Sequence, residues 1–190
     1  MFRSALRLSR PFSSITTRTL QRNFSASSIM SRVQGTESFS FNHTMLRIKD
    51  PKASLKFYQE ILGMELLDQH SGGDFTLYFL AFPQKEEEGL SAEQKAKNRF
   101  NREGILELTH NHGTENDPNF KGYANGNEDP GRGFGHIAIS VDNIEEACER
   151  FEKMGVQFKK KLTDGKMKHI AFILDCDGYW IEVVPKKLSL

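Results

Sequence analysis

The stretch NHTMLRIKDPKASLKFYQEILGMELL (42–67) sets a pattern that GHIAISVDNIEEACERFEKMGVQF (135–158) repeats. Each stretch has a histidine at the start of an alternating run, which then changes into a helical pattern that ends near a glycine. Two further segments, GILELTHN (104–111) and GYWIEVVP (178–185), each place a glutamate inside an apolar run. This internal repeat predicts a chain built from two copies of one supersecondary unit.

Side-chain alternation separates the polar candidates from an apolar face in all of these runs, because successive residues of a strand point to opposite sides. The predicted apolar faces carry Thr44, Leu46, Ile48, Leu106, Leu108, Ile137, Ile139, Val141, Ile181 and Val183. The opposite faces carry His43, Met45, Arg47, Glu107, Thr109, Asn111, His136, Ala138, Ser140, Trp180, Glu182 and Val184. Both histidines and both glutamates are therefore predicted to lie opposite a helix-packing face.

Helix signals follow each first strand. Asp50-Pro51 provides an N-cap and a proline at the first helical position, and Gly63 ends the pattern; Asp142 or Asn143 begins the second helix. The apolar stripes are Leu55, Tyr58, Ile61 and Leu62 in the first helix, and Ala147, Cys148, Phe151 and Met154 before Gly155 in the second. Strand-like runs follow at 75–82 and 168–175. The order β-α-β-β-β occurs twice, which predicts an α+β fold of two βαβββ modules.

The repeated histidines and glutamates predict one metal site. A single histidine on a strand is more often structural than a ligand, but His43, Glu107, His136 and Glu182 occupy repeat-equivalent positions. A glutamate inside an apolar run is costly unless it is paired or bound to a metal. Each open sheet face must also be covered, and two facing sheets would cover both. The other histidines lack this symmetry: we expect His110, His112 and His169 at the surface or in loops, and His70 in a turn with Ser71, Gly72 and Gly73.

Six strings closely resemble glyoxalase I, the lactoylglutathione lyase family of the vicinal oxygen chelate superfamily. They are HTMLRIKDPKASLKFY (43–58), LYFLAF (77–82), LELTHNHGTE (106–115), RGFGHIAISV (132–141), DGKMK (164–168) and DGYWIEVV (177–184). The resemblance covers residues 40–186, with modules at about 40–112 and 134–186. It implies the glyoxalase/bleomycin resistance/dioxygenase fold, in which paired sheets form a metal-containing cleft.

The resemblance implies roles for individual residues. The four metal ligands of the family match His43, Glu107, His136 and Glu182; Glu182 matches the principal catalytic base, and Glu107 matches a residue that assists with the other substrate enantiomer. The glutathione-binding positions match Arg47, Asn111, Arg132 and Lys160, with backbone contacts at Lys166 and Met167. This agrees with the chemistry of glutathione, because arginine binds carboxylates with two donors and lysine offers a point charge.

The implied activity is conversion of the methylglyoxal–glutathione hemithioacetal to S-lactoylglutathione through an enediolate, which detoxifies methylglyoxal. One divalent metal per site would act as a Lewis acid. Many animal members carry glutamine where this chain has His43, and bacterial members with histidine often prefer Ni²⁺ or Co²⁺. The inserted segment 83–103 resembles the zinc-using group, so we expect Zn²⁺. We also expect a homodimer in which each site takes residues from both chains.

Composition and the N-terminal segment indicate where the protein is found in the cell. The net charge of +1 offers no broad attraction to nucleic acid or membrane, and no run has the ~20 apolar residues of a membrane span. The two cysteines, Cys148 and Cys176, suggest no disulfide framework. Residues 1–36 are rich in Arg and Ser and lack acidic residues, which is typical of a transit peptide to the mitochondrial matrix; a product starting at Met30 would remain cytosolic.

Three alternative functions stay open at this stage. Another metal-dependent enzyme of the superfamily, such as an epimerase or extradiol dioxygenase, would use the same fold without this combination of ligands and glutathione-binding residues. A non-catalytic small-molecule-binding member would lack the metal ligands. A structural or interaction protein has only the charged run KEEEGLSAEQKAKNR (85–99) in its favour, which we expect to be solvated and partly helical.

Overall fold

The computed structural model describes residues 33–187 of the 190-residue chain. All helices and strands described here lie within residues Ser40–Leu190, and residues 33–39 belong to a separate unit. The predicted transit peptide and the internal start at Met30 fall almost wholly outside the described residues. No described helix is long and apolar enough to cross a membrane.

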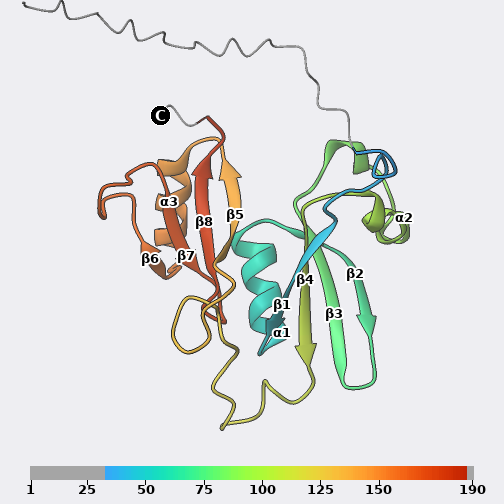
Figure 1. Cartoon of the computed structure of the whole chain (residues 1–190), viewed down its shortest axis with the longest axis horizontal. Helices are drawn as coiled ribbons and strands as arrows, with labels where there is room; N and C mark the ends of the chain where they lie inside the picture. Colours follow the sequence, from blue (N-terminus) through green and yellow to red (C-terminus); the bar gives the residue numbers. More distant parts are fainter. Residues whose placement is uncertain (1–32, 188–190) are drawn as a thin grey trace, which may run out of the picture. The chain divides into compact units, whose positions relative to one another are not determined.

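Two βαβββ modules follow one another along the chain, which confirms the predicted α+β fold (Figure 1). The first module consists of β1 (His43–Ile48), α1 (Pro51–Lys56), the π-helical turn η1 (Phe57–Ile61), β2 (Glu65–Ser71), β3 (Phe75–Ala81) and β4 (Ile105–Asn111). Between β3 and β4 it carries an insertion with η2 (Lys85–Glu87), α2 (Ala92–Asn98) and η3 (Arg99–Asn101). The second module consists of β5 (His136–Val141), α3 (Ile144–Lys153), β6 (Phe158–Lys160), β7 (Ala171–Leu174) and β8 (Trp180–Pro185).

Both sheets have the same topology. Their strand orders are β1-β4-β3-β2 and β5-β8-β7-β6, and in each the first two strands run parallel while the other pairs are antiparallel. The register places Met45 opposite Glu107 and Ala138 opposite Glu182. Each histidine therefore lies two residues before the residue that pairs with the glutamate of the neighbouring strand. The histidine and the glutamate are on the same face of the sheet.

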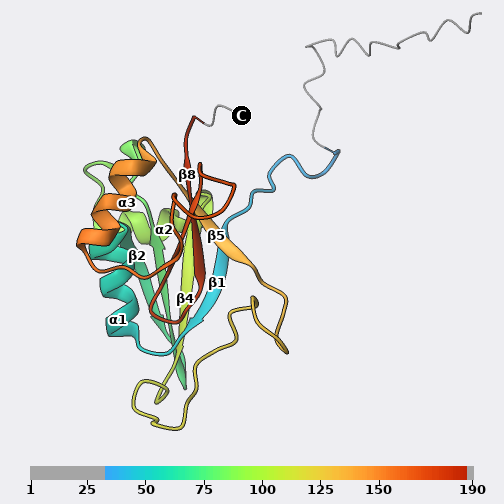
Figure 2. The ribbon, with the colours of Figure 1, turned by 90° about the vertical axis from the view of Figure 1, so that its left-hand side faces the viewer.

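The apolar faces of the two sheets contribute to one hydrophobic core. Leu46, Ile48 and Leu108 of the first module and Ile181 and Val183 of the second belong to the same buried cluster. The helices also meet, because the Arg150 side chain of α3 donates to the carbonyl oxygens of Glu60 and Ile61. Figure 2 shows α1 and α3 on the same side of the strands. The faces that carry the histidines and glutamates point away from this core.

The ends of the helices follow the sequence signals closely. The Asp50 carboxylate accepts a hydrogen bond from the Lys52 amide at 2.8 Å and caps α1. Of the two candidates for the second cap, Asn143 is the one used, and its side chain accepts from the Glu146 amide at 3.1 Å. Gly63 and Gly155 follow the helices with φ of +81° and +72°, a left-handed conformation that glycine adopts without steric cost.

Three details differ from the sequence predictions. Met154 is 42% exposed rather than part of the apolar stripe, because α3 already ends at Lys153 and the chain turns at Gly155. His70 belongs to β2 rather than to a turn, since the strand extends to Ser71 and only the glycines after it leave the ladder. The first helix continues after α1 as the π-helical turn η1 and ends there, which the 3.6-residue pattern did not reveal.

The insertion between β3 and β4 is helical, as expected, but it is not merely a solvated segment. Glu87 and Arg102 are each only 6% exposed and form an ion pair with one another. Arg102 also donates to the Phe82 carbonyl oxygen at 2.7 Å. The buried pair therefore ties the beginning of the insertion to its end, next to the start of β4.

Candidate metal centre

Each module holds one histidine and one glutamate in contact on its open sheet face. His43 Nε2 lies 3.2 Å from Glu107 Oε2, and His136 Nε2 lies 3.3 Å from Glu182 Oε2. The glutamates are the more enclosed members, with side chains 14% and 20% exposed, against 37% and 41% for the histidines. The two pairs are thus nearly identical in geometry as well as in sequence position.

An aromatic ring stands beside each pair at an equivalent place. Phe79 is the cross-strand neighbour of Glu107, and Phe172 is the cross-strand neighbour of Glu182. Each ring meets the histidine of its module edge-on, with centroids 6.3 Å apart for His43 and 5.3 Å apart for His136. These contacts restrict the orientation of both imidazoles, so the modules repeat a supporting residue that the sequence analysis had not identified.

The described part of one chain does not bring the four predicted ligands together. No group of three or more His, Cys, Asp or Glu residues among residues 33–187 is close enough to hold a metal ion. A cavity of about 440 Å³ between the modules reaches His136, but neither glutamate lines it. One chain therefore presents two separate His–Glu pairs, here termed half-sites, and each pair offers an imidazole nitrogen and a carboxylate oxygen.

Two of the predicted glutathione-binding residues lie close to the first half-site. Arg47 projects from β1 into a cavity of about 260 Å³ that Tyr123 and Tyr179 also line. Asn111 ends β4, and its side-chain oxygen accepts a hydrogen bond from the Tyr123 hydroxyl at 3.2 Å. Tyr123 thus connects the surroundings of Arg47 and Asn111, although the sequence analysis did not single it out.

The other predicted glutathione-binding residues lie on loops and strands away from this cavity. Arg132 is 71% exposed and pairs with Asp129 at 2.9 Å. The Lys160 ammonium donates to the carbonyl oxygens of Met167 at 2.6 Å and Ile170 at 2.8 Å, so it closes the loop that carries Lys166 and Met167. The structure therefore groups Lys160, Lys166 and Met167 with one another, and leaves Arg132 in an exposed segment.

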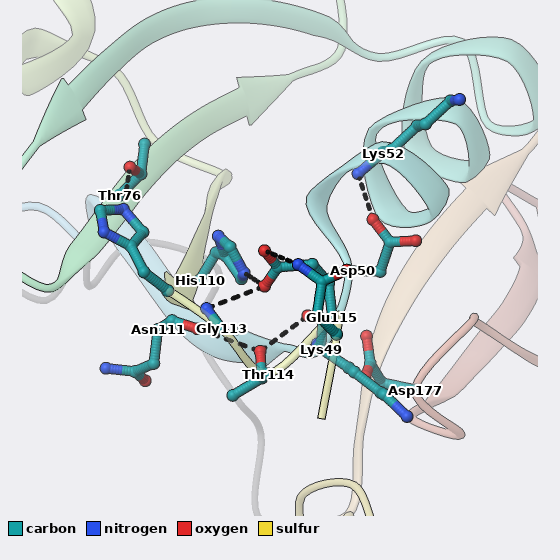
Figure 3. A network of polar contacts seen from close by, with 12 residues as sticks. Lys49, Asp50, Lys52, Thr76, His110, Asn111, Gly113, Thr114, Glu115 and Asp177 are labelled. Carbon is teal, nitrogen blue, oxygen red and sulfur yellow. Dashed lines mark hydrogen bonds and ion pairs between the residues drawn. The ribbon is translucent and has the colours of Figure 1, made fainter. Parts of the chain in front are cut away.

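His110 was expected at the surface, and that expectation is wrong. It is only 5% exposed, and its Nε2 lies 2.7 Å from Glu115 Oε2 (Figure 3). The Glu115 carboxylate accepts a hydrogen bond from its own backbone amide and one from His110, and both lower the pKa of this carboxyl. Alternation could have revealed this burial, because His110 shares its strand face with Leu106 and Leu108. His112 and His169 are exposed, as predicted.

The turn after β4 is held by the same network. The Thr114 hydroxyl donates to the Lys49 carbonyl oxygen at 2.7 Å, and Glu115 accepts from the Gly113 amide at 3.0 Å (Figure 3). His112 Nε2 lies 2.9 Å from the Thr76 hydroxyl. These bonds hold the chain immediately after Asn111 in place.

A second polar cluster joins the two modules. The Tyr58 hydroxyl donates to Asp175 Oδ2 at 2.7 Å, and the Lys49 amide donates to Asp177 Oδ1 at 2.9 Å. Burial raises the pKa of the Asp175 carboxyl to about 6. The turn that starts at Asp175 leads directly into β8, which carries Glu182, so this junction supports the second half-site.

Comparisons with known proteins agree with this architecture. The profile of the Glyoxalase/Bleomycin resistance protein/Dioxygenase superfamily matches residues 40–183. The chain belongs to this superfamily. Within it, the chain is 51% identical to a Pseudomonas aeruginosa lactoylglutathione lyase, over 81% of this chain and 86% of that protein. It is 53% identical to a lactoylglutathione lyase of Schizosaccharomyces pombe over 79% of this chain.

Lengths and folds of the relatives add two facts. The chain spans 46% of the Schizosaccharomyces pombe relative, about half its length. A solved structure of the trypanothione-dependent glyoxalase I of Leishmania major is similar in fold, with a TM-score of 0.56 and 29% identity, over 78% of this chain and 88% of that one. The resemblance to glyoxalase I and the two-module fold that it implied are thereby confirmed.

Proposed function

We propose that this protein is a lactoylglutathione lyase that converts the methylglyoxal–glutathione hemithioacetal to S-lactoylglutathione. The observation that carries this proposal is the pair of equivalent half-sites, His43–Glu107 and His136–Glu182, on the open sheet faces. Relatives about half identical to this chain that carry the name lactoylglutathione lyase support it.

The donor groups of the half-sites fit a divalent metal. Donors that each lie about 2.0–2.2 Å from one zinc ion are about 3–3.5 Å from one another, and the two observed His–Glu separations are 3.2 and 3.3 Å. The set of two imidazoles and two carboxylates suits Zn²⁺, with Ni²⁺ or Co²⁺ as the alternatives. When bound, the ion would supply Lewis-acid stabilisation of negative charge that develops on the substrate oxygens.

We infer that a complete site forms between two copies of the chain. One chain offers only a His–Glu pair on each open face, and a facing sheet from a second copy would complete the set of four donors. The exposed Met45, beside Arg47 on β1, and the exposed Phe134, just before β5, would then be covered. A homodimer built in this way has two equivalent sites, as a symmetric dimer requires.

The carboxylates and cations of the chain have distinct roles in this proposal. Glu182 removes the proton from C1 of the hemithioacetal and returns it to C2, and Glu107 assists with the other enantiomer. Both carboxylates are largely shielded from solvent by their sheets, which favours proton transfer over exchange with water. Arg47, Asn111, Arg132 and Lys160, with the backbone at Lys166 and Met167, bind the glutathione carboxylates and amides.

Residues 1–36 would direct the protein to the mitochondrial matrix, and a product starting at Met30 would remain in the cytosol. The arginines and the missing acidic residues of this segment support the proposal. Subcellular fractionation of cells that express the full chain with a C-terminal tag tests it. A full-length cytosolic product alone would contradict it.

The decisive experiment removes the metal with a chelator and restores Zn²⁺, Ni²⁺ or Co²⁺ one at a time. We expect lyase activity on the hemithioacetal to disappear and to return with a metal, most with Zn²⁺. Stoichiometric metal binding without turnover would instead favour another enzyme or a binding protein of the same superfamily.

Mixing two inactive variants tests the shared site. His43→Ala and His136→Ala should each inactivate the homodimer, because every site loses one ligand. In a heterodimer both substitutions fall in one site and the other site is intact, so unfolding and refolding an equimolar mixture should recover about one quarter of the sites. No recovery, with dimers re-formed, would contradict a site between chains.

A further inference from the structure

The side chain of Asn42 links the insertion to the first predicted metal ligand. Its Nδ2 donates to the carbonyl oxygens of Arg99 at 2.9 Å and of Arg102 at 2.8 Å. Its Oδ1 lies 2.7 Å from His43 Nδ1. We propose that Asn42 is a positioning residue that holds His43 as the Nδ1–H tautomer, and that the insertion sets the orientation of Asn42.

The orientation of the amide follows from its partners. Both carbonyl oxygens are acceptors only, so the NH₂ group of Asn42 must face them and the Oδ1 must face the imidazole. The opposite orientation would set the amide oxygen against two carbonyl oxygens. An oxygen at 2.7 Å from His43 Nδ1 then requires that this nitrogen carries the proton.

This proton assignment prepares the other ring nitrogen. In a neutral imidazole with Nδ1 protonated, Nε2 keeps its lone pair, and that lone pair faces Glu107 Oε2 at 3.2 Å. Two acceptor atoms directed at one point attract a cation, and metal-bound histidines commonly donate their second N–H to a fixed oxygen. The inference therefore rests on the proposed function, since it assigns His43 the role of a metal ligand.

The carbonyl groups that fix Asn42 belong to a rigid part of the insertion. Arg99 lies over the Phe79 ring, with its guanidinium carbon 4.9 Å from the centroid, and pairs with Asp68 at 2.8 Å. Arg102 is held by its buried ion pair with Glu87. The insertion thus has a specific role in the site, although its charged composition predicts only a solvated surface.

The second module has no counterpart to this arrangement. Gly135 precedes His136, so no side chain stands where Asn42 stands in the first module. Within the described part of one chain, His136 Nδ1 has no hydrogen-bond partner. His136 therefore serves as an internal reference for any effect on His43.

The test combines three variants of the full chain with ¹⁵N spectra of its imidazoles and with zinc titration. In the chelator-treated protein, at a pH where both imidazoles are neutral, long-range ¹H–¹⁵N correlations report which ring nitrogen carries the proton. Asn42→Ala removes the acceptor and the donors, whereas Asn42→Asp keeps an acceptor oxygen beside His43 and loses the donors. The control Asn98→Ala removes an exposed side-chain amide of the same insertion, and this side chain makes no hydrogen bond within the described residues.

We expect His43 to be the Nδ1–H tautomer in the original protein, in Asn42→Asp and in Asn98→Ala, and to shift toward Nε2–H in Asn42→Ala. Zinc affinity should fall about 10- to 100-fold in Asn42→Ala, as is typical for loss of a ligand's hydrogen-bond partner, and should be largely kept in Asn42→Asp. His136 should be unchanged throughout. The melting temperature should fall in both Asn42 variants, because both lose the bonds to the insertion.

Two results in the Asn42 variants would overturn the proposal. The first is an unchanged His43 tautomer in Asn42→Ala; the second is equal loss of zinc affinity in Asn42→Ala and Asn42→Asp, which indicates a purely structural role. If Asn42→Ala does not fold, the tautomer of His43 in the unaltered protein decides, and Nε2–H overturns the proposal. The tautomer shift in a protein that binds zinc but lacks lyase turnover would support this inference and contradict the proposed function.

Discussion

The two modules repeat the same His–Glu pair but support it in different ways. In the first module, an insertion between β3 and β4 reaches the pair through Asn42 and is itself held by the buried Glu87–Arg102 ion pair. The second module lacks an insertion, and its turn before β8 is held by contact with the first module, through Tyr58 and Asp175. Strand geometry and the aromatic ring beside each histidine are therefore the parts that repeat, whereas the remaining contacts that support the two His–Glu pairs are unrelated.

The largest expected difference between the half-sites is chemical. Glu182→Gln should lower kcat by about 10²- to 10⁴-fold, the usual contribution of a general base, while Glu107→Gln should lower it less for the preferred enantiomer. Steady-state kinetics on the hemithioacetal, with zinc content measured for both variants, checks this. Circular dichroism controls for the fold. Near-normal turnover of Glu182→Gln would remove the chemical distinction between the half-sites.

Breaking the buried ion pair that holds the insertion of the first module should cost more unfolding free energy than breaking the junction that supports the second module. Arg102→Met leaves the Glu87 carboxylate buried without its partner, which typically costs about 3–5 kcal/mol of unfolding free energy. Urea denaturation measures the loss. The matched control is the double variant Glu87→Gln/Arg102→Met, which should recover much of the stability because no unpaired charge remains. A small effect of Arg102→Met would mean that water reaches Glu87 and that the insertion is loosely held.

The parts of the site that sequence reasoning predicted are those controlled by local geometry. Alternation along single strands placed His43 and Glu107 opposite Leu46 and Leu108, and the structure confirms those faces. Alternation predicted these faces correctly because the two-residue period of a strand does not depend on what the strand packs against. The helix caps were predictable for the same reason, since a cap bonds to an amide only two or three residues away.

The parts that sequence reasoning missed depend on contacts between distant segments. Glu87 and Arg102 lie in a polar run whose composition indicates solvent, and only their meeting in space buries them. Asn42 bonds to carbonyl oxygens 57 and 60 residues away, which no side-chain pattern encodes. His110 is a different case, because alternation with Leu108 indicates burial, whereas a lack of repeat symmetry carries no information about exposure.

The junction that supports the second module should respond to pH. Burial raises the pKa of Asp175 to about 6, above the usual 3.9 of an unfolded aspartate, so the folded state binds the proton more tightly. Asp175 therefore contributes most to stability below about pH 4, and the contribution, about 3 kcal/mol at most, is lost as the pH rises through about 6.

Asp175→Asn isolates that contribution. Its free energy of unfolding, measured by urea denaturation between pH 4 and 7, should lack the part of the downward slope that Asp175 causes. Burial also raises the pKa of Asp177, so some slope of the same sign should remain in the variant. Identical slopes in the original protein and in Asp175→Asn would show that the carboxylate at the junction is well solvated, and the two modules would then differ less in their support.

The smallest expected effects concern the helix caps, which are a repeated feature and should therefore behave alike. Asp50→Ala and Asn143→Ala each remove a side chain that accepts a bond from a first-turn amide, so each should cost about 1 kcal/mol. The first module adds one complication, because burial raises the pKa of the half-buried Asp177 and repulsion from the Asp50 carboxylate raises it further. Removing Asp50 relieves that repulsion, so the measured cost of Asp50→Ala should be slightly below that of Asn143→Ala.

Asp50→Asn separates the capping hydrogen bond from the charge repulsion, since it keeps the cap and removes the charge. This variant should be neutral or slightly stabilising in thermal unfolding. A larger loss for Asp50→Ala than for Asn143→Ala would mean that the caps have diverged between the modules as the supports of the half-sites have.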